Sequence, residues 1–346
     1  MAKKLILSTI SNIILHYVGN KNNGEGVSYS NTKIEVSEHL AKTITMLVYS
    51  NFNFNEYYEF YYIPELKLNS LYNFISNIFN INSDFVDQSK NCARHLYEQS
   101  IHPKIKGGEF YTVYFKDCIL DGETFDAVGL FKSENKDTFL KVLQENGNFN
   151  LQTEKGINIK KLDKGCLIFN KERESGYVVA VVDNVGKGAE ARYWLNDFLH
   201  VRRRKDEYTN TQNFMTLAKN FVTQELPKEL GTTKADQINL LNKSLDFFKD
   251  KDTCDIDDFT NEVMIEPDII EKFHHYKQRC EDENGTSIDT SFPVSETARK
   301  KQQRLFKRVI QLDKKIKIVI DGNSKNIEQG TDKKGKFYKV YYDEEK

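Results

Sequence analysis

The chain has 346 residues, enough for one large domain or two of ordinary size. Apolar residues make up 39% and charged residues 29%, which fits a packed core beneath a heavily charged surface. The formal net charge of −1 excludes a molecule that is cationic throughout, so binding to a polyanion would need a local basic patch.

The cysteines indicate a reducing compartment. Their number is odd, their spacing is irregular, and no C-x-x-C pair occurs among Cys92, Cys118, Cys166, Cys254 and Cys280. The apolar run at Leu5–Leu7 breaks at Ser8, and it is read as a first strand rather than a signal peptide. No stretch approaches the roughly 18 apolar residues of a membrane span, so we expect a cytoplasmic protein without a membrane partner.

The first 100 residues predict one strand and three helices. Residues 5–18 are strand-forming, and an Asn- and Gly-rich loop follows. Apolar residues at helical spacing predict a helix over 38–49 and two helices within 70–98.

Residues 105–183 predict an antiparallel meander. β-branched and aromatic residues fill 109–118 and 124–131, and the Asp121-Gly122 pair between them favours a hairpin turn. Two further strands are predicted at 165–170 and 177–182.

Beyond the meander, the pattern becomes helical. A helix is predicted over 189–201 and a charged hinge over 202–207, which sets the domain boundary. Residues 208–311 are interpreted as helical throughout, and strand-like runs at 316–320 and 336–342 are interpreted as a terminal β pair.

The predicted fold class is therefore α+β with two domains. The N-terminal domain (1–203) has an antiparallel sheet with packed helices, and the C-terminal domain (204–346) is mainly helical and closes with a β pair.

The near-zero net charge hides strong segregation. Residues 246–289 contain fourteen acids and five bases, whereas residues 295–317 contain nine bases and two acids. The later segment has a helix start signal at Ser295, and Leu305, Phe306, Val309 and Ile310 are expected to face the core.

A helix with one cationic face can lie along a phosphate backbone, because each neutralised phosphate releases a condensed counterion. The candidate nucleic-acid-binding residues on this helix are Arg299, Lys300, Arg304, Lys307 and Arg308. Arg202, Arg203 and Arg204 form a second candidate group. Other interpretations remain open for both groups. The cationic helix face is simply solvated, or it pairs with the acidic segment at residues 246–289. The arginine run only forms a hinge, where its positive charge complements the C-terminal end of a helix.

Other chemistry is weakly supported. Asp183–Gly188 lacks a complete phosphate-loop motif and is interpreted as a tight strand-to-helix turn. The acids between Asp250 and Glu262 lack the glycine of a calcium loop, and His274, His275 and Cys280 lack zinc-ligand spacing. We therefore predict no catalytic residues, no metal and no cofactor. One enzymatic alternative is a metal-dependent nuclease that uses Asp117, Asp121, Glu123, Asp126, Glu134 and Lys136.

The order of several stretches resembles the 37-kDa nucleoid-associated bacterial protein family. The carriers are IILHYVGN (13–20), GGEFYTVYF (107–115), FDAVGLFKSE (125–134), GYVVAVVD (176–183), ARYWLNDFL (191–199), SFP (291–293) and the terminal IKIVIDG and FYKVYYD runs. The chain departs from the family pattern at Gln311–Lys315 and in its longer N-terminal loop. The resemblance implies a cytoplasmic, nucleoid-localised DNA-binding protein that has no catalytic centre and forms a homodimer.

Three functional hypotheses follow. The first is a non-enzymatic protein that binds double-stranded DNA through phosphates, with low sequence preference and a steep salt dependence. The second is a protein-interaction module, whose acidic segment and aromatic residues near Tyr57–Tyr62 recruit a DNA-processing or DNA-topology enzyme. The third is the metal-dependent nuclease.

Overall fold

The computed structural model describes residues 5–80, 83–185, 193–284, 287–306, 309–312, 315–320, 327–342 and 344. The chain divides into two compact units, Ala2–Arg204 and Lys205–Lys346. The fold is mixed α+β with a large antiparallel sheet, which confirms the predicted fold class.

The N-terminal unit is built on one antiparallel sheet with the strand order β11-β4-β10-β9-β6-β5-β2-β3, and β1 also pairs with β5. Its strands are β1 (Leu5–Ile6), β2 (Thr9–Val18), β3 (Val27–Ser28), β4 (Tyr58–Phe60), β5 (Gly108–Leu120), β6 (Glu123–Ser133), β9 (Lys164–Phe169), β10 (Val178–Asp183) and β11 (Val201–Arg203). The predicted meander is confirmed in β5, β6, β9 and β10, whose neighbours pair antiparallel.

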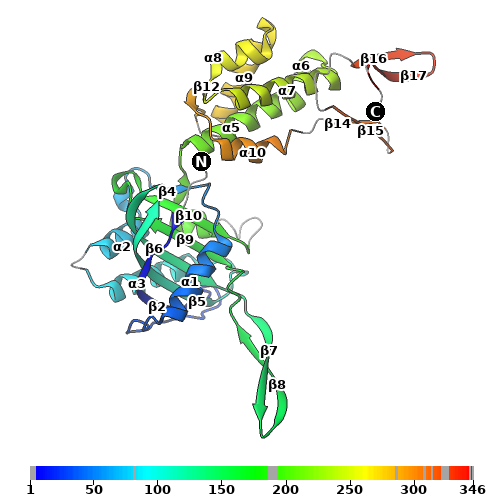
Figure 1. The fold of residues 1–346 in the computed structure, drawn as a ribbon. Coiled ribbons are helices and arrows are strands. Elements are labelled where there is room, and N and C mark those ends of the chain that lie inside the picture. The colour runs from blue at the N-terminus through cyan, green and yellow to red at the C-terminus, as the bar shows by residue number, and fades with distance from the viewer. Residues whose placement is uncertain are drawn as a thin grey trace. The chain divides into compact units, whose positions relative to one another are not determined.

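Both faces of this sheet carry helices, so the unit has two apolar cores (Figure 1). Helix α1 (Glu38–Asn51) packs on one face, and α2 (Ser70–Phe79) and α3 (Phe85–Gln99) pack on the other. Side chains cap the N-terminus of each helix, as Ser37 does for α1 by accepting the Leu40 N–H. All three predicted helices are therefore confirmed. Short 3₁₀ turns lie at Leu66–Leu68 and Arg173–Ser175.

The predicted helix over 189–201 is confirmed only in part. Residues 189–192 lie outside the described residues, and Tyr193–Leu199 is helical with wide π-type turns. Val201 instead begins strand β11, which pairs with β4. The buried Trp194 and Phe198 attach this helix to the core shared with α2 and α3.

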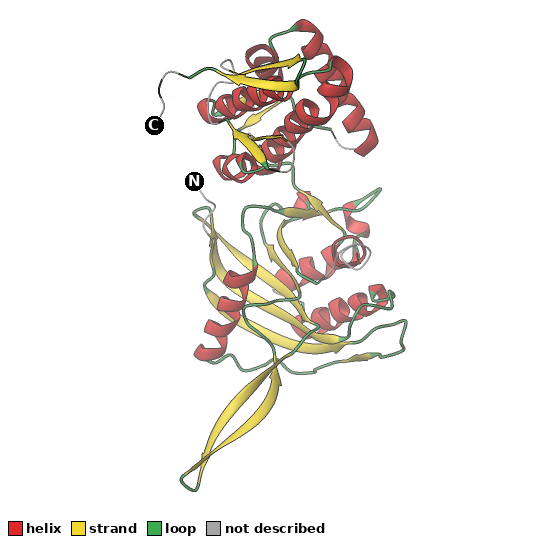
Figure 2. Cartoon of the chain, turned by 90° about the vertical axis from the view of Figure 1, so that its right-hand side faces the viewer, coloured by secondary structure: helices red, strands yellow, loops and turns green. Residues whose placement is uncertain are grey.

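A long hairpin that the sequence analysis missed projects from the sheet of this unit (Figure 2). Its strands β7 (Asp137–Glu145) and β8 (Asn148–Gly156) pair only with each other among the described residues. Asn146 and Gly147 form the turn, both with positive φ. An Asn-Gly pair between alternating apolar residues is a strong hairpin signal, so the sequence did contain the evidence.

The C-terminal unit is mainly helical. It contains α5 (Glu207–Asn220), α6 (Leu226–Leu230), α7 (Lys234–Asp250), α8 (Ile256–Phe259), α9 (Pro267–Asn284) and α10 (Glu296–Gln303), with π-type turns at Phe221–Glu225 and Thr260–Met264. Its core is aromatic: the rings of Phe259 and Phe273 lie 5.0 and 6.1 Å from the ring of Phe214.

Two expectations for this unit were wrong. Residues 208–311 are not helical throughout, because β12 (Thr253–Asp255) pairs with β13 (Ser291–Pro293) and β14 (Val309–Leu312) is also a strand. The two terminal runs do not pair with each other either. Strand β15 (Ile316–Val319) pairs with β14, and β17 (Gly335–Val340) pairs with β16 (Ile327–Asp332). Each run therefore completes its hairpin with the strand that directly precedes it.

Candidate nucleic-acid interface

Helix α10 carries two of the predicted DNA-binding residues, Arg299 and Lys300, and a third, Arg304, directly follows it. The Ser295 side chain caps it by accepting the Ala298 N–H, and the Ser295 N–H donates to Thr211 Oγ1 at 2.9 Å. Ala298 and Gln302 are buried on the side that faces α5. Lys300 and Arg304 lie four residues apart and are both exposed, so they share an outward face.

The basic helix is shorter than predicted. It ends at Gln303, and Val309 and Ile310 pair with β15 instead of continuing the apolar helix face. Leu305 is 51% exposed and does not face the core, whereas Phe306 is buried as expected. Val309 and Ile310 are β-branched and pair with Val319 and Ile318, which favours a strand over a longer helix. The predicted contacts at Lys307 and Arg308 lie outside the described residues.

The charges on α10 are held only loosely. Lys300 Nζ lies 2.6 Å from Glu296 Oε1, and both side chains are more than half exposed. This contact lowers the pKa of Glu296, with Lys300 as its main cause. An exposed ion pair within one helix contributes little stability, so Lys300 can exchange this partner for a phosphate. Arg299 on the same helix is half-buried.

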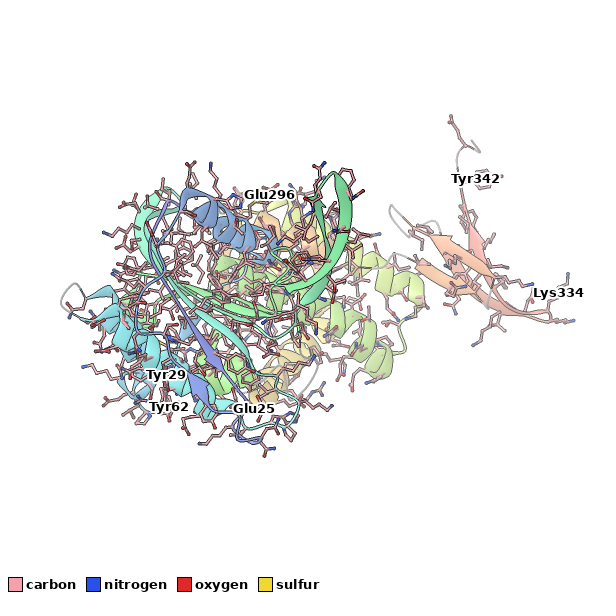
Figure 3. The ribbon with its side chains drawn as sticks, turned by 90° about the horizontal axis from the view of Figure 1, so that it is seen from below. Glu25, Tyr29, Tyr62, Glu296, Lys334 and Tyr342 are labelled. Atoms are coloured by element: carbon pink, nitrogen blue, oxygen red, sulfur yellow. The ribbon has the colours of Figure 1, made fainter. Side chains whose placement is uncertain are left out.

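The two C-terminal hairpins carry exposed lysines that were not among the predicted DNA-binding residues. Lys315 and Lys317 are exposed at β15. The β16–β17 hairpin has further exposed lysines at its turn and along β17, namely Lys333, Lys334, Lys336 and Lys339 (Figure 3 labels Lys334 at the hairpin end). The DNA major groove is wide enough to admit a two-stranded ribbon, so this hairpin is a second candidate cationic element.

Both hairpins are anchored to helix α7 through a small apolar cluster. Ile238 on α7, Ile310 on β14 and the following Ile320 are buried together, and Ile327 and Tyr338 pack against them. Because Tyr338 faces this cluster, alternation along β17 places Phe337 and Lys339 on the other side of the hairpin.

The acidic segment is partly neutralised by cations of the same helical region. Lys251 pairs with Glu262 at 2.7 Å and Lys277 pairs with Glu281 at 2.8 Å, both within residues 246–289. Lys272 and Arg279 of this segment pair with two acids outside it, Glu229 and Glu225. These ion pairs do not use the cations of α10 or of the terminal hairpins, and Lys300 takes its acid from its own helix.

Arg202, Arg203 and Arg204 do not form an open cationic run. The first two lie in strand β11 rather than in a hinge, because β11 pairs with β4 of the sheet. Each arginine contacts a different carboxylate: Arg202 contacts Glu59 at 2.9 Å, Arg203 contacts Glu56 at 3.4 Å, and Arg204 contacts Glu172. Arg204 is 17% exposed and also donates to the Tyr177 carbonyl, which indicates a structural role.

The residues of the nuclease hypothesis have separate partners. Asp126 Oδ2 accepts a hydrogen bond from Tyr114 Oη at 2.6 Å, and its Oδ1 accepts the Asp117 N–H at 3.1 Å. Ion pairs hold three others, Glu123 with Lys171, Glu134 with Lys132, and Lys136 with Glu109. Within the described ranges, no group of three His, Cys, Asp or Glu side chains is arranged to hold a metal ion.

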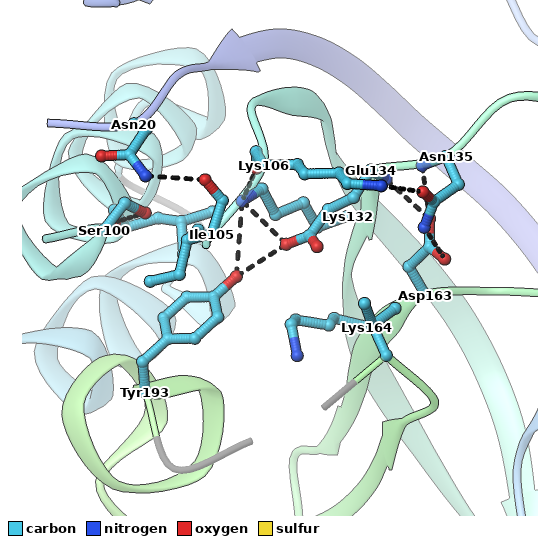
Figure 4. Close-up of polar contacts among 12 residues, drawn as sticks. Asn20, Ser100, Ile105, Lys106, Lys132, Glu134, Asn135, Asp163, Lys164 and Tyr193 are labelled. Carbon is cyan, nitrogen blue, oxygen red and sulfur yellow. Dashed lines mark hydrogen bonds and ion pairs between the residues drawn. The ribbon is translucent and has the colours of Figure 1, made fainter. Parts of the chain in front are cut away.

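A buried ionic cluster lies beside β6 and β9 of the N-terminal unit (Figure 4). Lys132 Nζ lies 3.0 Å from Glu134 Oε1 and donates to the Lys106 carbonyl at 2.8 Å. Tyr193 Oη donates to the same Glu134 oxygen at 2.9 Å. Burial lowers the pKa of Lys132, and the neighbouring Glu134 opposes this shift.

A second buried pair completes this cluster. Lys164 Nζ lies 2.6 Å from Asp183 Oδ1 and 5.0 Å from the centre of the Tyr193 ring. The strand-to-helix turn predicted at Asp183–Gly188 therefore begins with an ion-paired residue, and its residues 186–188 lie outside the described residues. Lys132 and Lys164 each face a buried carboxylate, so neither lysine offers a free cation to DNA.

Comparisons with known proteins supply the remaining evidence. No helix among the described residues is long and apolar enough to cross a membrane. A search of curated proteins finds no match for the chain. A family model described as nucleoid-associated protein YejK matches residues 14–344, which is nearly the whole chain. The protein therefore belongs to the nucleoid-associated protein YejK family.

Proposed function

We propose that this protein binds double-stranded DNA directly through the C-terminal unit, by phosphate contacts and with low sequence preference. The contacting residues in this proposal are Lys300 of α10 and Arg304 directly after it, together with Arg299 and the lysines of the β15 and β17 hairpins. Lys307 and Arg308 extend the same basic run in the sequence. Arg202 and Arg203 are secondary candidates, because they would first have to leave Glu59 and Glu56.

One observation carries the proposal. Lys300, Arg304 and the described lysines of the terminal hairpins are exposed, while the ion pairs of the acidic segment are made with other cations. A nearly neutral protein can therefore still present basic elements to a polyanion. Membership in a nucleoid-associated family supports DNA as that polyanion.

The physical consequence is a salt-dependent affinity. Each phosphate that a lysine or arginine neutralises releases condensed counterions, and the slope of log affinity against log salt changes by about 0.9 per contact. Since such contacts do not read base edges, duplexes of unrelated sequence should bind alike.

The test is a salt titration of the purified full chain with labelled duplexes of unrelated sequence, monitored by fluorescence anisotropy. The double variant Lys300→Ala with Arg304→Ala should bind several-fold more weakly and reduce the salt slope by about two. The matched control, Lys249→Ala with Lys272→Ala, removes the same charge from the acidic segment and should leave the slope unchanged. Equal losses of DNA affinity in both variants would mean that only the net charge of the protein matters, and would contradict the proposed interface.

We also propose that the protein acts in the cytoplasm, at the nucleoid, as a homodimer without enzymatic activity. DNA binding that appears only after a second protein is added would replace direct contact by recruitment of a DNA-processing or DNA-topology enzyme. Magnesium-dependent DNA cleavage that Asp126→Ala abolishes would contradict the non-enzymatic assignment.

A further inference from the structure

One face of the β16–β17 hairpin carries an aromatic ring that lies flat over the neighbouring strand. Phe337 on β17 is opposite Gly330 on β16, so the two residues share a face. A Cβ at Gly330 would lie 2.4, 2.8 and 2.9 Å from three neighbouring atoms of the Phe337 ring. Because these distances are nearly equal, the ring turns a flat side, and not an edge, towards Gly330. Its other flat side is open to solvent, since Phe337 is 42% exposed.

A second ring lies further along the same face. Tyr341 directly follows β17 and is 45% exposed. Its hydroxyl donates to Glu328 Oε2 at 3.1 Å, and Lys339 Nζ lies 4.6 Å from the centre of its ring. Glu328 and Lys339 are opposite each other, two positions from the Phe337–Gly330 pair, so all of them share what we call the aromatic face.

The aromatic face is not the one that attaches the hairpin to the helices. Ile327 and Tyr338 pack against the apolar cluster with α7, and alternation places them on the opposite face from Phe337. The contact with α7 therefore does not use the two rings of the aromatic face. They remain available to a partner.

The charges around the rings favour a polyanion as that partner. Residues 327–342 contain four lysines and two acids, a net charge of +2. Both acids lie on the aromatic face, and each accepts a hydrogen bond within the hairpin: Glu328 from Tyr341, and Asp332 from the Lys334 N–H at 2.7 Å. Three exposed lysines lie within four residues of Phe337, around the turn where Figure 3 labels one of them, namely Lys333, Lys334 and Lys336.

An exposed flat ring beside lysines has the chemistry that recognises an unpaired base. Stacking of a base on an aromatic side chain favours single strands of any sequence, because every base has a flat π face, and cations beside the ring hold the phosphates of the strand. In a duplex, the neighbouring base pairs cover these faces, and a side chain reaches them only if a base step is unstacked. Lysines alone would not distinguish a single strand from a duplex, whereas the rings do.

We infer that the aromatic face of the β16–β17 hairpin binds single-stranded DNA, with one base stacked on Phe337 and another on Tyr341. The two residues are four positions apart in extended chain, roughly 13 Å, so one strand can contact both rings. The lysines around the turn neutralise phosphates of the same strand. The inference rests on the DNA contact of this hairpin in the proposed function, and it adds the form of DNA that the hairpin selects.

The test is fluorescence anisotropy of the full chain with a labelled DNA single strand and with a duplex of the same length. The variant Phe337→Leu with Tyr341→Leu keeps the charge and the apolar character of both positions but removes the rings. It should weaken single-strand binding by at least about tenfold and leave duplex binding unchanged. Phe337→Tyr keeps a ring and should retain single-strand binding. Phe149→Leu, which removes an exposed ring from the β7–β8 hairpin, is the matched control and should change neither affinity.

Photochemical cross-linking gives a second readout. A single strand that carries 5-iodouracil joins efficiently to an aromatic ring stacked on that base, and mass spectrometry of the digested complex identifies the residue. The cross-link should map to Phe337 or Tyr341. Cross-links confined to residues outside this hairpin would overturn the inference.

The outcomes separate this inference from the proposed function. A wild type that binds duplexes but no single strand overturns the inference alone, whereas one that binds single strands but no duplex overturns the proposed duplex binding alone. Equal losses for both forms of DNA in the double ring variant would overturn the inference, because the rings would then support the hairpin itself.

Two further results would assign the aromatic face to a different partner and so overturn the inference. One is tighter binding of an RNA strand than of the DNA strand with the same sequence. The other is self-association of the wild type that the double ring variant abolishes, measured by sedimentation velocity without DNA.

Discussion

Lys132 Nζ lies 3.0 Å from Glu134 Oε1, and only 0% and 3% of the two side chains are exposed. The chain thus buries two opposite charges only two positions apart, and Tyr193 ties them to the helix at Tyr193–Leu199. Removing one partner of such a pair leaves an uncompensated charge in the core, whereas removing both does not.

This pair gives the first prediction. Glu134→Ala should lower the free energy of unfolding of the N-terminal unit by about 3–5 kcal/mol. The double variant Lys132→Met with Glu134→Leu should lose less, because no buried charge is left unpaired. Urea unfolding followed by Trp194 fluorescence measures this, since the chain has one tryptophan and it is buried in this unit. A loss below about 1 kcal/mol in the single variant would contradict the argument.

The second prediction concerns acid stability. His16 is buried, its Nδ1 accepts the Ser30 N–H at 3.1 Å, and its Nε2 lies 2.9 Å from Ser89 Oγ. Burial, aided by the positive charge of Lys90, lowers the pKa of His16 to about 4. Protonation of Nδ1 would break the bond from Ser30, which fits a neutral ring in the folded protein.

The direction in which stability changes with pH follows from proton binding to His16. Below pH about 6.5 the unfolded chain protonates His16, whereas the folded protein does not until pH about 4. Stability contributed by the neutral ring is complete above pH 6.5 and is lost as the pH falls towards 4, by up to about 3 kcal/mol. Urea midpoints followed by Trp194 fluorescence should therefore fall over this range, and less steeply for His16→Gln. Identical pH profiles of the two proteins would refute the assignment.

The third prediction tests the β16–β17 hairpin as a DNA contact. Lys333→Ala, Lys334→Ala and Lys336→Ala together should reduce the salt slope of DNA binding by up to about three, while far-UV circular dichroism stays unchanged. The fold should tolerate the change because Ile327 and Tyr338, which anchor the hairpin, remain. An unchanged slope would restrict the interface to α10 and its neighbours.

The fourth prediction separates the two roles within the arginine run. Arg204→Ala should destabilise the N-terminal unit by about 1.5–3 kcal/mol, because its largely buried guanidinium contacts Glu172 and the Tyr177 carbonyl. Arg202→Ala should stay within about 0.5 kcal/mol, since its side chain is 63% exposed. Trp194 fluorescence reports both values. Similar losses in the two variants would argue against this division.

The fifth prediction concerns a close backbone approach. Gly176 has φ 97°, and a Cβ at this position would lie 2.1 Å from the Phe60 carbonyl oxygen. The Phe60 N–H also donates to the Gly176 carbonyl at 2.8 Å. Gly176→Ala should therefore push β4 away and lower the unfolding midpoint, whereas Gly122→Ala meets no atom within 4 Å and carries only the cost of its positive φ. Equal unfolding midpoints of the two variants would contradict this, because they would show that the backbone around Gly176 relaxes without a cost in free energy.

Elements with a strong local signal were predictable from the sequence. Helix α1 has regular apolar spacing behind the Ser37 cap, and the β5–β6 hairpin has the Asp121-Gly122 turn between alternating strands. The same kind of signal, Asn146-Gly147, marks the β7–β8 hairpin that was overlooked. These features depend on neighbours within a few residues, so a local pattern is enough to specify them.

The end of α10 was decided by contacts that are distant in sequence. Leu305, Phe306, Val309 and Ile310 have helical spacing, yet Val309–Leu312 forms a strand. The strand wins because β15 supplies backbone partners and because Ile310 is buried against Ile238 of α7. Tertiary packing of this kind overrides local propensity.

The sequence by itself determined the α+β class, the helices and hairpins with local signals, and the segregation of acidic from basic residues. Only the tertiary structure decided which charges are free, because the carboxylates that hold Arg202, Arg203 and Arg204 come from Glu59, Glu56 and Glu172, far away in the chain. Charge is a property of composition, whereas its neutralisation depends on distances that only the folded chain establishes.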